Sequence, residues 1–239
     1  MHDFGVQQSY CVAEFAKFTG PVVRTTTGLN GHQAGCEVGK VLLHLDKYRD
    51  LKEGLPQGEV VLFLDAAHPT MATKLGYDWS LKGERKIVAT TAGKARINVI
   101  GTLNAQTLKL VTTFPATVNS ETLAEHFVRL RRSYPRHRFS TLNIILDQGS
   151  YCVSKATQIE AARLDIKLWH LPPYSPNLNL IERVWKVMNE QVRDNVYFPD
   201  ERVFISTIKD FFLNRWSKLA KSLTTRFADN FQIIQNPAF

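Results

Sequence analysis

The segments Val60-Val61-Leu62-Phe63-Leu64-Asp65 and Leu142-Asn143-Ile144-Ile145-Leu146-Asp147 indicate how this chain folds. Each is an apolar run of strand length that ends in an aspartate, which is typical of a strand buried on both faces. Such a strand places a carboxylate at the rim of a sheet, where burying the charge without a partner would be costly. If the two strands are neighbours, both carboxylates emerge at the same edge, within reach of a shared cation.

A third acid, Glu182, starts a helical pattern just after the proline-rich loop of residues 171–176. Asn179 and Glu182 have the spacing of a capping box, in which the acid bonds back to the start of the helix and needs no chemical role. Alternatively, the helix begins against the sheet edge, where its dipole favours the ionised carboxylate that a metal ligand requires. The residues alone leave both interpretations open, and Asp65 and Asp147, each taken alone, fit turn positions at least as well.

Three carboxylates converging at one edge would suit a divalent cation, because Mg²⁺ prefers hard oxygen ligands. In a basic chain, such a site indicates phosphodiester chemistry. Ser150 lies in no nucleophile-elbow pattern, so acyl transfer has little support. His68 and His170 are expected to form hydrogen bonds or to pack, in preference to binding a metal.

Hydrophobic periodicity predicts the order of the other elements. The predicted strands cover residues 60–64, 86–91, 96–103, 108–114, 141–146 and 167–171, and the predicted helices cover residues 39–55, 122–134, 154–164, 181–192 and 200–227. Parallel strands need crossover connections, so this order predicts an α/β fold with a mixed sheet flanked by helices.

The composition fits one sizeable globular domain. The chain has 239 residues, of which 44% are hydrophobic and 22% charged, and a net charge of +8. No apolar run approaches the roughly 18 residues of a membrane span, so no membrane association is expected. Cys11, Cys36 and Cys152 show no metal-ligand spacing, which predicts reduced thiols in a cytoplasmic protein and no zinc site.

Two groups of basic residues are candidates for contact with phosphate groups. One consists of Arg129, Arg131, Arg132, Arg136 and Arg138, and the other of Lys82, Arg85, Lys86, Lys94 and Arg96, opposed only by Glu84. A solvated face explains either group equally well when it is taken alone. If the three acids form a metal site, contact with a nucleic-acid backbone becomes the better interpretation.

Several motifs resemble the insertion-sequence branch of the mariner superfamily of DDE transposases. They are Phe63-Leu64-Asp65-Ala66-Ala67-His68-Pro69, Leu75-Gly76-Tyr77-Asp78-Trp79 and Leu146-Asp147-Gln148-Gly149-Ser150-Tyr151. The most specific is Leu171-Pro172-Pro173-Tyr174-Ser175-Pro176-Asn177-Leu178-Asn179-Leu180-Ile181-Glu182-Arg183-Val184-Trp185. As in that branch, 34 residues separate Asp147 from Glu182. The resemblance runs from about Tyr48 to the C-terminus.

This resemblance implies an RNase H-like fold with a mixed five-stranded sheet, in which Asp65, Asp147 and Glu182 are the metal-binding catalytic residues. It also implies DNA cleavage and strand transfer with two Mg²⁺ ions, for which Mn²⁺ could substitute. One ion would be held by Asp65 and Asp147, and the other by Asp65 and Glu182. Glu182 then becomes a ligand that could also serve as a cap.

The expected partners are transposon ends and target DNA, bound by a homodimer in the bacterial cytoplasm at the nucleoid. The residues expected to contact DNA are Lys82, Arg85, Lys86, Arg131, Arg132 and Arg183.

Residues 1–45 form a divergent N-terminal segment, and residues 46–239 form the expected catalytic domain. The first forty residues lack two clean amphipathic helices around a turn, whereas the family places a helix-turn-helix region there. Truncation or a shifted reading frame upstream would produce this pattern. The alternative function is therefore an inactive remnant that binds DNA without catalysis. A general RNase H-type nuclease is less favoured, because the proline-loop motif is typical of the transposases.

Overall fold

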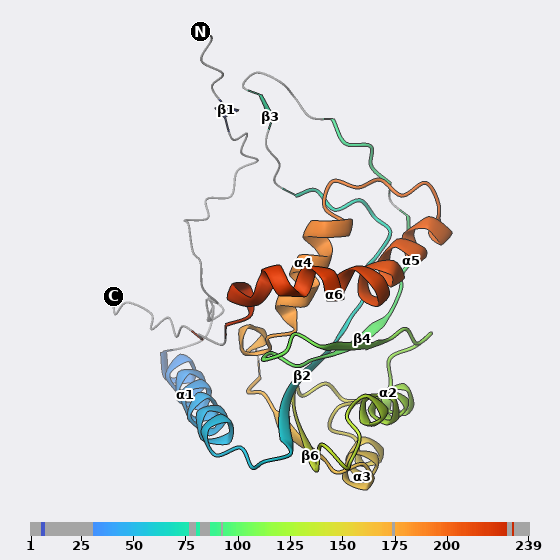
Figure 1. Cartoon of the computed structure of the whole chain (residues 1–239). Helices are drawn as coiled ribbons and strands as arrows, with labels where there is room; N and C mark the ends of the chain where they lie inside the picture. The colour runs from blue at the N-terminus through green and yellow to red at the C-terminus, as the bar shows by residue number, and fades with distance from the viewer. Residues whose placement is uncertain are drawn as a thin grey trace.

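A five-stranded mixed sheet forms the centre of the computed structural model (Figure 1). The structure describes residues 31–76, 87–91, 93–173, 175–228 and 231, together with the backbone of 6–7 and 80–81, and side chains from residue 39 onward. The strands are β2 (Glu59–Ala67), β4 (Val99–Leu103), β5 (Leu110–Thr113), β6 (Thr141–Leu146) and β7 (Ile166–His170), in the order β5-β4-β2-β6-β7. β2, β6 and β7 run parallel, while β4 and β5 are antiparallel to their neighbours. The predicted mixed sheet is confirmed.

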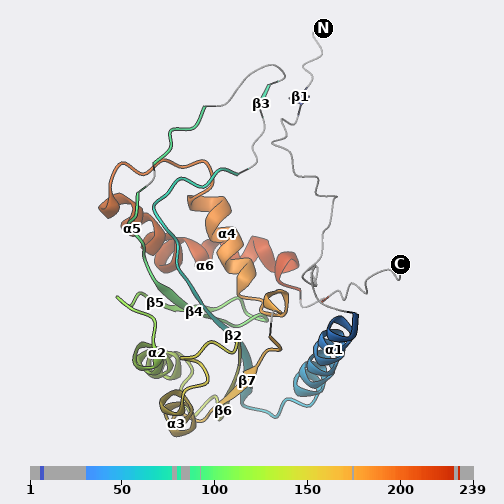
Figure 2. The same ribbon diagram turned by 180° about the vertical axis from the view of Figure 1, so that it is seen from behind.

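Helices cover both faces of this sheet (Figures 1 and 2). α2 (Ser120–Ser133) and α3 (Lys155–Arg163) lie on one face. The other face carries α4 (Glu182–Val192) and a continuous helical block. The block consists of α5 (Glu201–Asp210), the π-helical turn η2 (Phe211–Arg215), α6 (Trp216–Leu219) and the 3-10 segment η3 (Ala220–Phe227). A short 3-10 turn, η1 (Pro176–Leu178), precedes α4.

Alternate residues of β2 feed two separate cores, as the two-residue period of a strand requires. Leu62 and Leu64 pack with Phe127 of α2 in one core. Phe63 packs with Val184 of α4 in the other, and all these side chains are nearly inaccessible to solvent. Asp65 continues the row of Phe63, so the sheet directs its carboxylate toward the face that carries α4.

Local signals fixed several boundaries. Thr122 N donates to Asn119 Oδ1 at 2.9 Å, and Asn119 N donates to Thr122 Oγ1 at 3.0 Å, which closes a capping box at the predicted start of α2. β6 has the predicted bounds. The first helix, α1 (Gly31–Glu53), begins earlier than predicted, and it spans the boundary expected between residues 45 and 46.

One predicted strand is wrong. Residues 87–91, the described part of the predicted strand 86–91, form a loop, and Ile87 is 92% exposed. Both edges of β4, the next strand along the chain, are already paired with β2 and β5, so this segment cannot pair with β4. It is held instead beside the segment after β2, where Thr73 N donates to Thr91 O at 3.2 Å. The short strands β1 (Val6–Gln7) and β3 (Ser80–Leu81) pair with each other outside the main sheet.

No helix formed by the described part of the chain is both long and apolar enough to cross a bilayer.

Candidate active site

Asp65 lies where β2 loses one of its two neighbours. β2 pairs with β6 only as far as Phe63↔Ile145, but with β4 as far as Ala67↔Val99. The strand therefore continues three residues beyond its predicted end at residue 64, because β4 still supplies hydrogen bonds there. On the β6 side the sheet has already opened at Asp65, which leaves room for a carboxylate.

Asp147 directly follows β6 and is exposed. Because the parallel register pairs Phe63 with Ile145, Asp65 and Asp147 each lie two residues beyond the last pair, at the same edge of the sheet. The Asp147 carboxylate accepts a bond from Cys152 Sγ at 3.5 Å and a weak one from Gly149 N at 3.4 Å, both to Oδ1. Oδ2 carries no such bond within the described residues.

Glu182 is the first residue of α4, and the capping box considered for it is not formed. Ile181 occupies the cap position without a side-chain bond. The side chain of Asn179 instead donates from Nδ2 to the carbonyl oxygen of Leu64 at 2.9 Å. This bond brings the start of α4 against the end of β2, as the alternative interpretation of Glu182 expected.

The three carboxylates interact electrostatically. Burial raises the pKa of Asp65 to about 6, Asp147 adds to the rise, and the hydrogen bond from Trp185 opposes it. Burial also raises the pKa of Glu182 to about 7, followed by repulsion from Asp65 and Asp147, although the Glu182 side chain keeps contact with solvent. Crowded negative charge of this kind is a feature of functional sites.

The three side chains are nevertheless not drawn into a closed cage. Within the described residues, no group of three His, Cys, Asp or Glu side chains is close enough to hold an ion. The donor set still has the right chemistry, since all three are carboxylates and the ligand oxygens that Mg²⁺ prefers are hard. The metal roles of Asp65, Asp147 and Glu182 therefore remain predictions.

A domain model described as DDE superfamily endonuclease matches residues 60–205. The chain belongs to this DDE superfamily endonuclease family. This agrees with the resemblance drawn from its motifs.

The matches to two relatives each cover only part of this chain. This chain is 25% identical over 138 residues to the insertion element IS630 uncharacterized 39 kDa protein of Shigella sonnei. The match covers 56% of this chain and 39% of that protein. This chain is 33% identical over 82 residues to the uncharacterized protein y4pE/y4sA of Sinorhizobium fredii, which covers 34% of this chain and 57% of that protein. In both cases the match covers less than two thirds of the relative.

Solved structures share the fold. The Mos1 transposase paired-end complex with left transposon end superposes with a TM-score of 0.59 at 12% identity, covering 92% of this chain and 67% of that chain. The crystal structure of the catalytic domain of Mos1 mariner transposase superposes with a TM-score of 0.54 at 12% identity. This superposition covers 85% of this chain and 94% of that chain. The RNase H-like fold implied by the motifs is confirmed.

Residues around the DDE acids that the sequence did not single out are Tyr151, Cys152 and Trp185. A Cβ added at Gly149 would lie 3.2 Å from Tyr151 Cε1 and 3.6 Å from Asp147 Oδ1, so this ring lies close to the acid. Burial, then the nearby Asp147, raises the pKa of the Cys152 thiol to about 12, and the thiol therefore stays protonated and donates. Tyr151 and Cys152 could have been found from their place just after Asp147, whereas Trp185 only shows its role once α4 packs on the sheet.

The two histidines form hydrogen bonds, as expected. His68 Nδ1 bonds to Asn98 Oδ1 at 2.8 Å, and His170 Nδ1 bonds to the carbonyl oxygen of Asp147 at 3.2 Å. Asn98 Nδ2 is already directed at the carbonyl of Ala116 at 2.6 Å, so its Oδ1 accepts and His68 Nδ1 carries the proton.

The residues expected to contact DNA lie in different environments in the structure. Arg131 is buried and donates to the carbonyl oxygens of Phe139 and Ser140 at 2.9 and 2.7 Å. These carbonyls precede β6 whereas Asp147 follows it, and a six-residue strand is about 20 Å long. Arg131 is therefore engaged with the protein at the far end of β6 from Asp147, and its contact with DNA stays a prediction.

Arg183 is likewise engaged with the protein. Its Nη1 donates to the carbonyl oxygens of Arg226 and Ala228 at 2.8 and 2.6 Å, which fastens the end of η3 to α4. Arg132 is exposed at the C-terminal end of α2, and its contact with DNA stays a prediction. Lys82, Arg85 and Lys86 lie outside the described residues.

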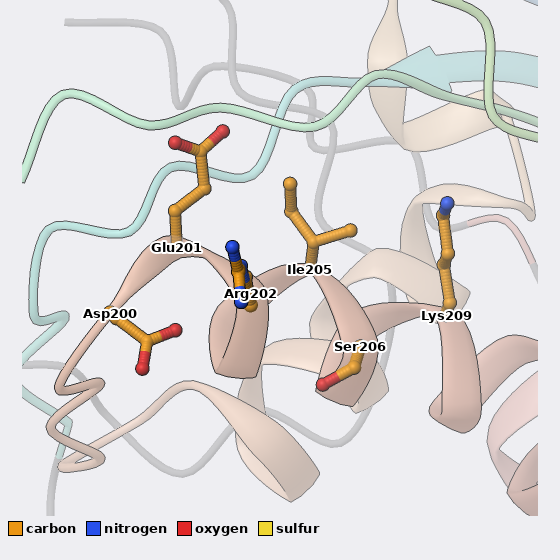
Figure 3. Close-up of a pocket in the computed structure, with 6 residues that line it drawn as sticks. All are labelled: Asp200, Glu201, Arg202, Ile205, Ser206 and Lys209. Atoms are coloured by element: carbon orange, nitrogen blue, oxygen red, sulfur yellow. The ribbon is translucent and has the colours of Figure 1, made fainter.

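A hollow of about 820 Å³ lies beside α5 (Figure 3). Its described lining residues are Asp200, Glu201, Arg202, Ile205, Ser206 and Lys209. None of the three acids lines it, and charges of both signs do, so its described walls show no preference for phosphate.

Proposed function

We propose that this protein is a transposase that cleaves DNA at transposon ends and joins them to target DNA, with Asp65, Asp147 and Glu182 as ligands of two Mg²⁺ ions. The observation that carries the proposal is that Asp65 and Asp147 lie at the same edge of the sheet and that the start of α4, which carries Glu182, is bonded to β2 beside Asp65. Membership of the DDE endonuclease family supports the same chemistry.

Neighbouring structures support metal use. The Mos1 structures include a mariner paired-end complex with Mg and another with Mn. Here, cations would offset the repulsion among the three carboxylates and the cost of burying Asp65. Binding them would require the side chains to move closer together than they lie now.

The residues of the site have distinct parts in this proposal. Bound Mg²⁺ would supply Lewis-acid stabilisation and lower the pKa of the attacking water or 3′-hydroxyl. Asp65, inside the paired part of β2, would hold a fixed position shared by both ions. Asp147 has one oxygen held by Cys152 and Gly149 and would offer the other to the ions. Glu182 reaches the site from the helix.

DNA would be held by basic side chains. Arg132, together with Lys82, Arg85 and Lys86, is proposed to contact backbone phosphates, which would make the affinity dependent on salt. The Mos1 complexes are formed on transposon ends, and pairing two ends by a homodimer is the corresponding proposal for this chain.

The decisive experiment uses the full chain and duplexes carrying the inverted repeats that flank its own gene. Cleavage at the ends in Mg²⁺ and none in EDTA supports the transposase, and Asp147→Asn should abolish cleavage while DNA binding persists. Binding without cleavage would support an inactive remnant instead. Indiscriminate cutting of RNA–DNA hybrids would point to a general nuclease, and unchanged nicking by Asp147→Asn would refute the site.

A further inference from the structure

Trp185 connects two of the three catalytic acids proposed above. It lies on α4 three residues after Glu182, and its indole Nε1 donates a hydrogen bond of 2.8 Å to Asp65 Oδ2. The side chain is buried, with 6% of its surface exposed. The helix that carries Glu182 is therefore bonded directly to the carboxylate on β2.

The sheet provides a dedicated space for this indole. Gly101 of β4 is the cross-strand partner of Asp65. A Cβ at Gly101 would lie 2.7 Å from Trp185 Cη2, which is too close for a real contact, and 3.0 Å from Ile181 Cδ1, which is tight. The absence of a side chain at position 101 thus lets the ring approach the sheet closely enough to reach Asp65.

Other packing fixes the orientation of the ring. Phe212 of η2 meets the Trp185 ring edge-on, with centroids 5.8 Å apart and planes at 81°. The indole cannot turn its N–H away from Asp65 without leaving Phe212 and opening a void beneath α4. The hydrogen bond is therefore preorganised by the core and does not depend on a mobile side chain.

We propose that Trp185 is a positioning residue, whose indole N–H fixes Oδ2 of Asp65 so that Oδ1 is presented to the metal ions. The inference rests on the proposed function, since it assigns a partner to one of the proposed ligands. Groups that orient metal ligands in this way typically change metal affinity or activity by about 10–100-fold when they are removed.

A tryptophan that only filled the core would bond equally well to a group unrelated to the site. Trp216 of α6 does this, since its Nε1 donates to the carbonyl oxygen of Leu108 at 2.8 Å in the same core. Trp216→Phe is therefore a matched control that removes an indole hydrogen bond of the same length and leaves the three acids untouched.

The experiment compares Trp185→Phe with Trp216→Phe in end cleavage across a Mg²⁺ series. Phenylalanine keeps most of the ring packing and removes the N–H. For Trp185→Phe we expect the Mg²⁺ concentration at half-maximal rate to rise roughly tenfold and the saturated rate to fall about 10–100-fold. For Trp216→Phe we expect wild-type values of both. Wild-type Mg²⁺ dependence and rate in folded Trp185→Phe would overturn the inference.

A second measurement on the wild type covers the case in which Trp185→Phe does not fold. Indole-¹⁵N-labelled protein gives one N–H signal for each tryptophan, assigned by single Trp→Phe variants of Trp79, Trp169 and Trp216. The remaining signal, from Trp185, should shift on addition of Mg²⁺, whereas that of Trp216 should not. If Mg²⁺ supports cleavage and leaves the Trp185 signal unmoved, this inference alone fails. If the wild type neither cleaves nor responds to Mg²⁺, the proposed function fails and the inference with it.

Discussion

Asn179 donates a hydrogen bond of 2.9 Å from its side-chain amide to the carbonyl oxygen of Leu64, the residue that precedes Asp65. The two residues are 115 positions apart, and Asn179 is only 4% exposed. A bond at this point sets the distance between the end of β2 and the start of α4. The relative placement of Asp65 and Glu182 therefore depends on this buried amide as well as on the hydrogen bond from Trp185 to Asp65.

Replacing the Asn179 amide should lower end cleavage by more than the loss of stability explains. Asn179→Ala leaves the Leu64 carbonyl without this partner, which should lower the free energy of unfolding by about 1–3 kcal/mol, measured by urea denaturation. End cleavage should fall further than stability explains, because Glu182 loses its fixed distance to Asp65. Asn177→Ala, at a half-buried position of the same loop, is the control and should change neither. A folded Asn179→Ala protein with wild-type cleavage would contradict the role given to Asn179.

Arg131 and Arg132 are adjacent in sequence and should behave oppositely. Arg131→Gln breaks its bonds to the carbonyl oxygens of Phe139 and Ser140, so we expect a loss of roughly 2–4 kcal/mol in the free energy of unfolding. Arg132→Gln, at an exposed position, should leave stability within about 0.5 kcal/mol of the wild type.

DNA binding should instead respond to Arg132→Gln, the variant that leaves stability nearly unchanged. Arg132→Gln should reduce the slope of log affinity against log salt by about 0.9 for each phosphate that the variant no longer neutralises. This is measured by fluorescence anisotropy with the terminal-repeat duplex at several salt concentrations. An unaltered slope would remove Arg132 from the proposed DNA-binding residues, and an unaltered stability of Arg131→Gln would contradict its structural role.

The sequence predicted the layers of this fold because its strongest signals are periodic. The apolar run of β6 was bounded correctly, and the helix predicted over residues 122–134 matches α2 to within two residues at each end. The error at residues 86–91 arose because β-branched residues describe only a local preference, whereas a strand needs a free edge to pair with. The next strand along the chain, β4, was already paired on both sides.

The sequence predicted which acids to consider for the site, but not the hydrogen bonds that hold the residues around them. A capping box and a packed helix start give Glu182 the same sequence spacing, and only the bond from Asn179 to Leu64 distinguishes them. A cluster of arginines likewise does not reveal that Arg131 turns inward to bond carbonyl groups before β6. Trp185 resembled one more apolar residue on the stripe of α4, because its hydrogen bond depends on Gly101 in a strand 84 positions earlier.

Without metal, Glu182 should destabilise the protein at alkaline pH. Burial and the neighbouring acids raise its folded-state pKa to about 7, above the usual value near 4.5. The folded state therefore binds more protons between these values, and the associated stability is present below about pH 4.5 and is lost as the pH rises through 7. In EDTA, Glu182→Gln should be more stable than the wild type at pH 8, by at most about 1 kcal/mol because the side chain reaches solvent.

Mg²⁺ should reverse this order. Ion binding adds stability to the wild type and little to Glu182→Gln, so in thermal melts at pH 8 the wild type should gain more from Mg²⁺ than the variant. Glu125→Gln, at an exposed position of α2, should follow the wild type in both conditions. Equal responses of Glu182→Gln and the wild type to Mg²⁺ would exclude Glu182 as a ligand.

His126 should make the fold sensitive to acid. Its ring is fully buried between two hydroxyls, with Nε2 at 2.8 Å from Thr102 Oγ1 and Nδ1 at 2.9 Å from Thr113 Oγ1. Burial, and secondarily Arg129, lowers the pKa of His126 to about 3. Between pH 6.5 and about 3, the unfolded chain binds a proton that the folded chain excludes. The stability is therefore complete above pH 6.5 and falls with decreasing pH, by up to about 1.4 kcal/mol per unit.

A comparison of two histidines tests this sign. Urea denaturation at pH 5, 6, 7 and 8 should show that the wild type loses stability toward pH 5 relative to His126→Gln, whose amide has no proton to gain in this range. The variant should be less stable at pH 8, because glutamine cannot reproduce both hydroxyl bonds in the same space. His137→Gln, at an exposed position, should parallel the wild type at every pH. A constant difference between His126→Gln and the wild type from pH 8 to pH 5 would show that His126 can take up its proton in the folded state, and that its burial does not limit the acid stability of this domain.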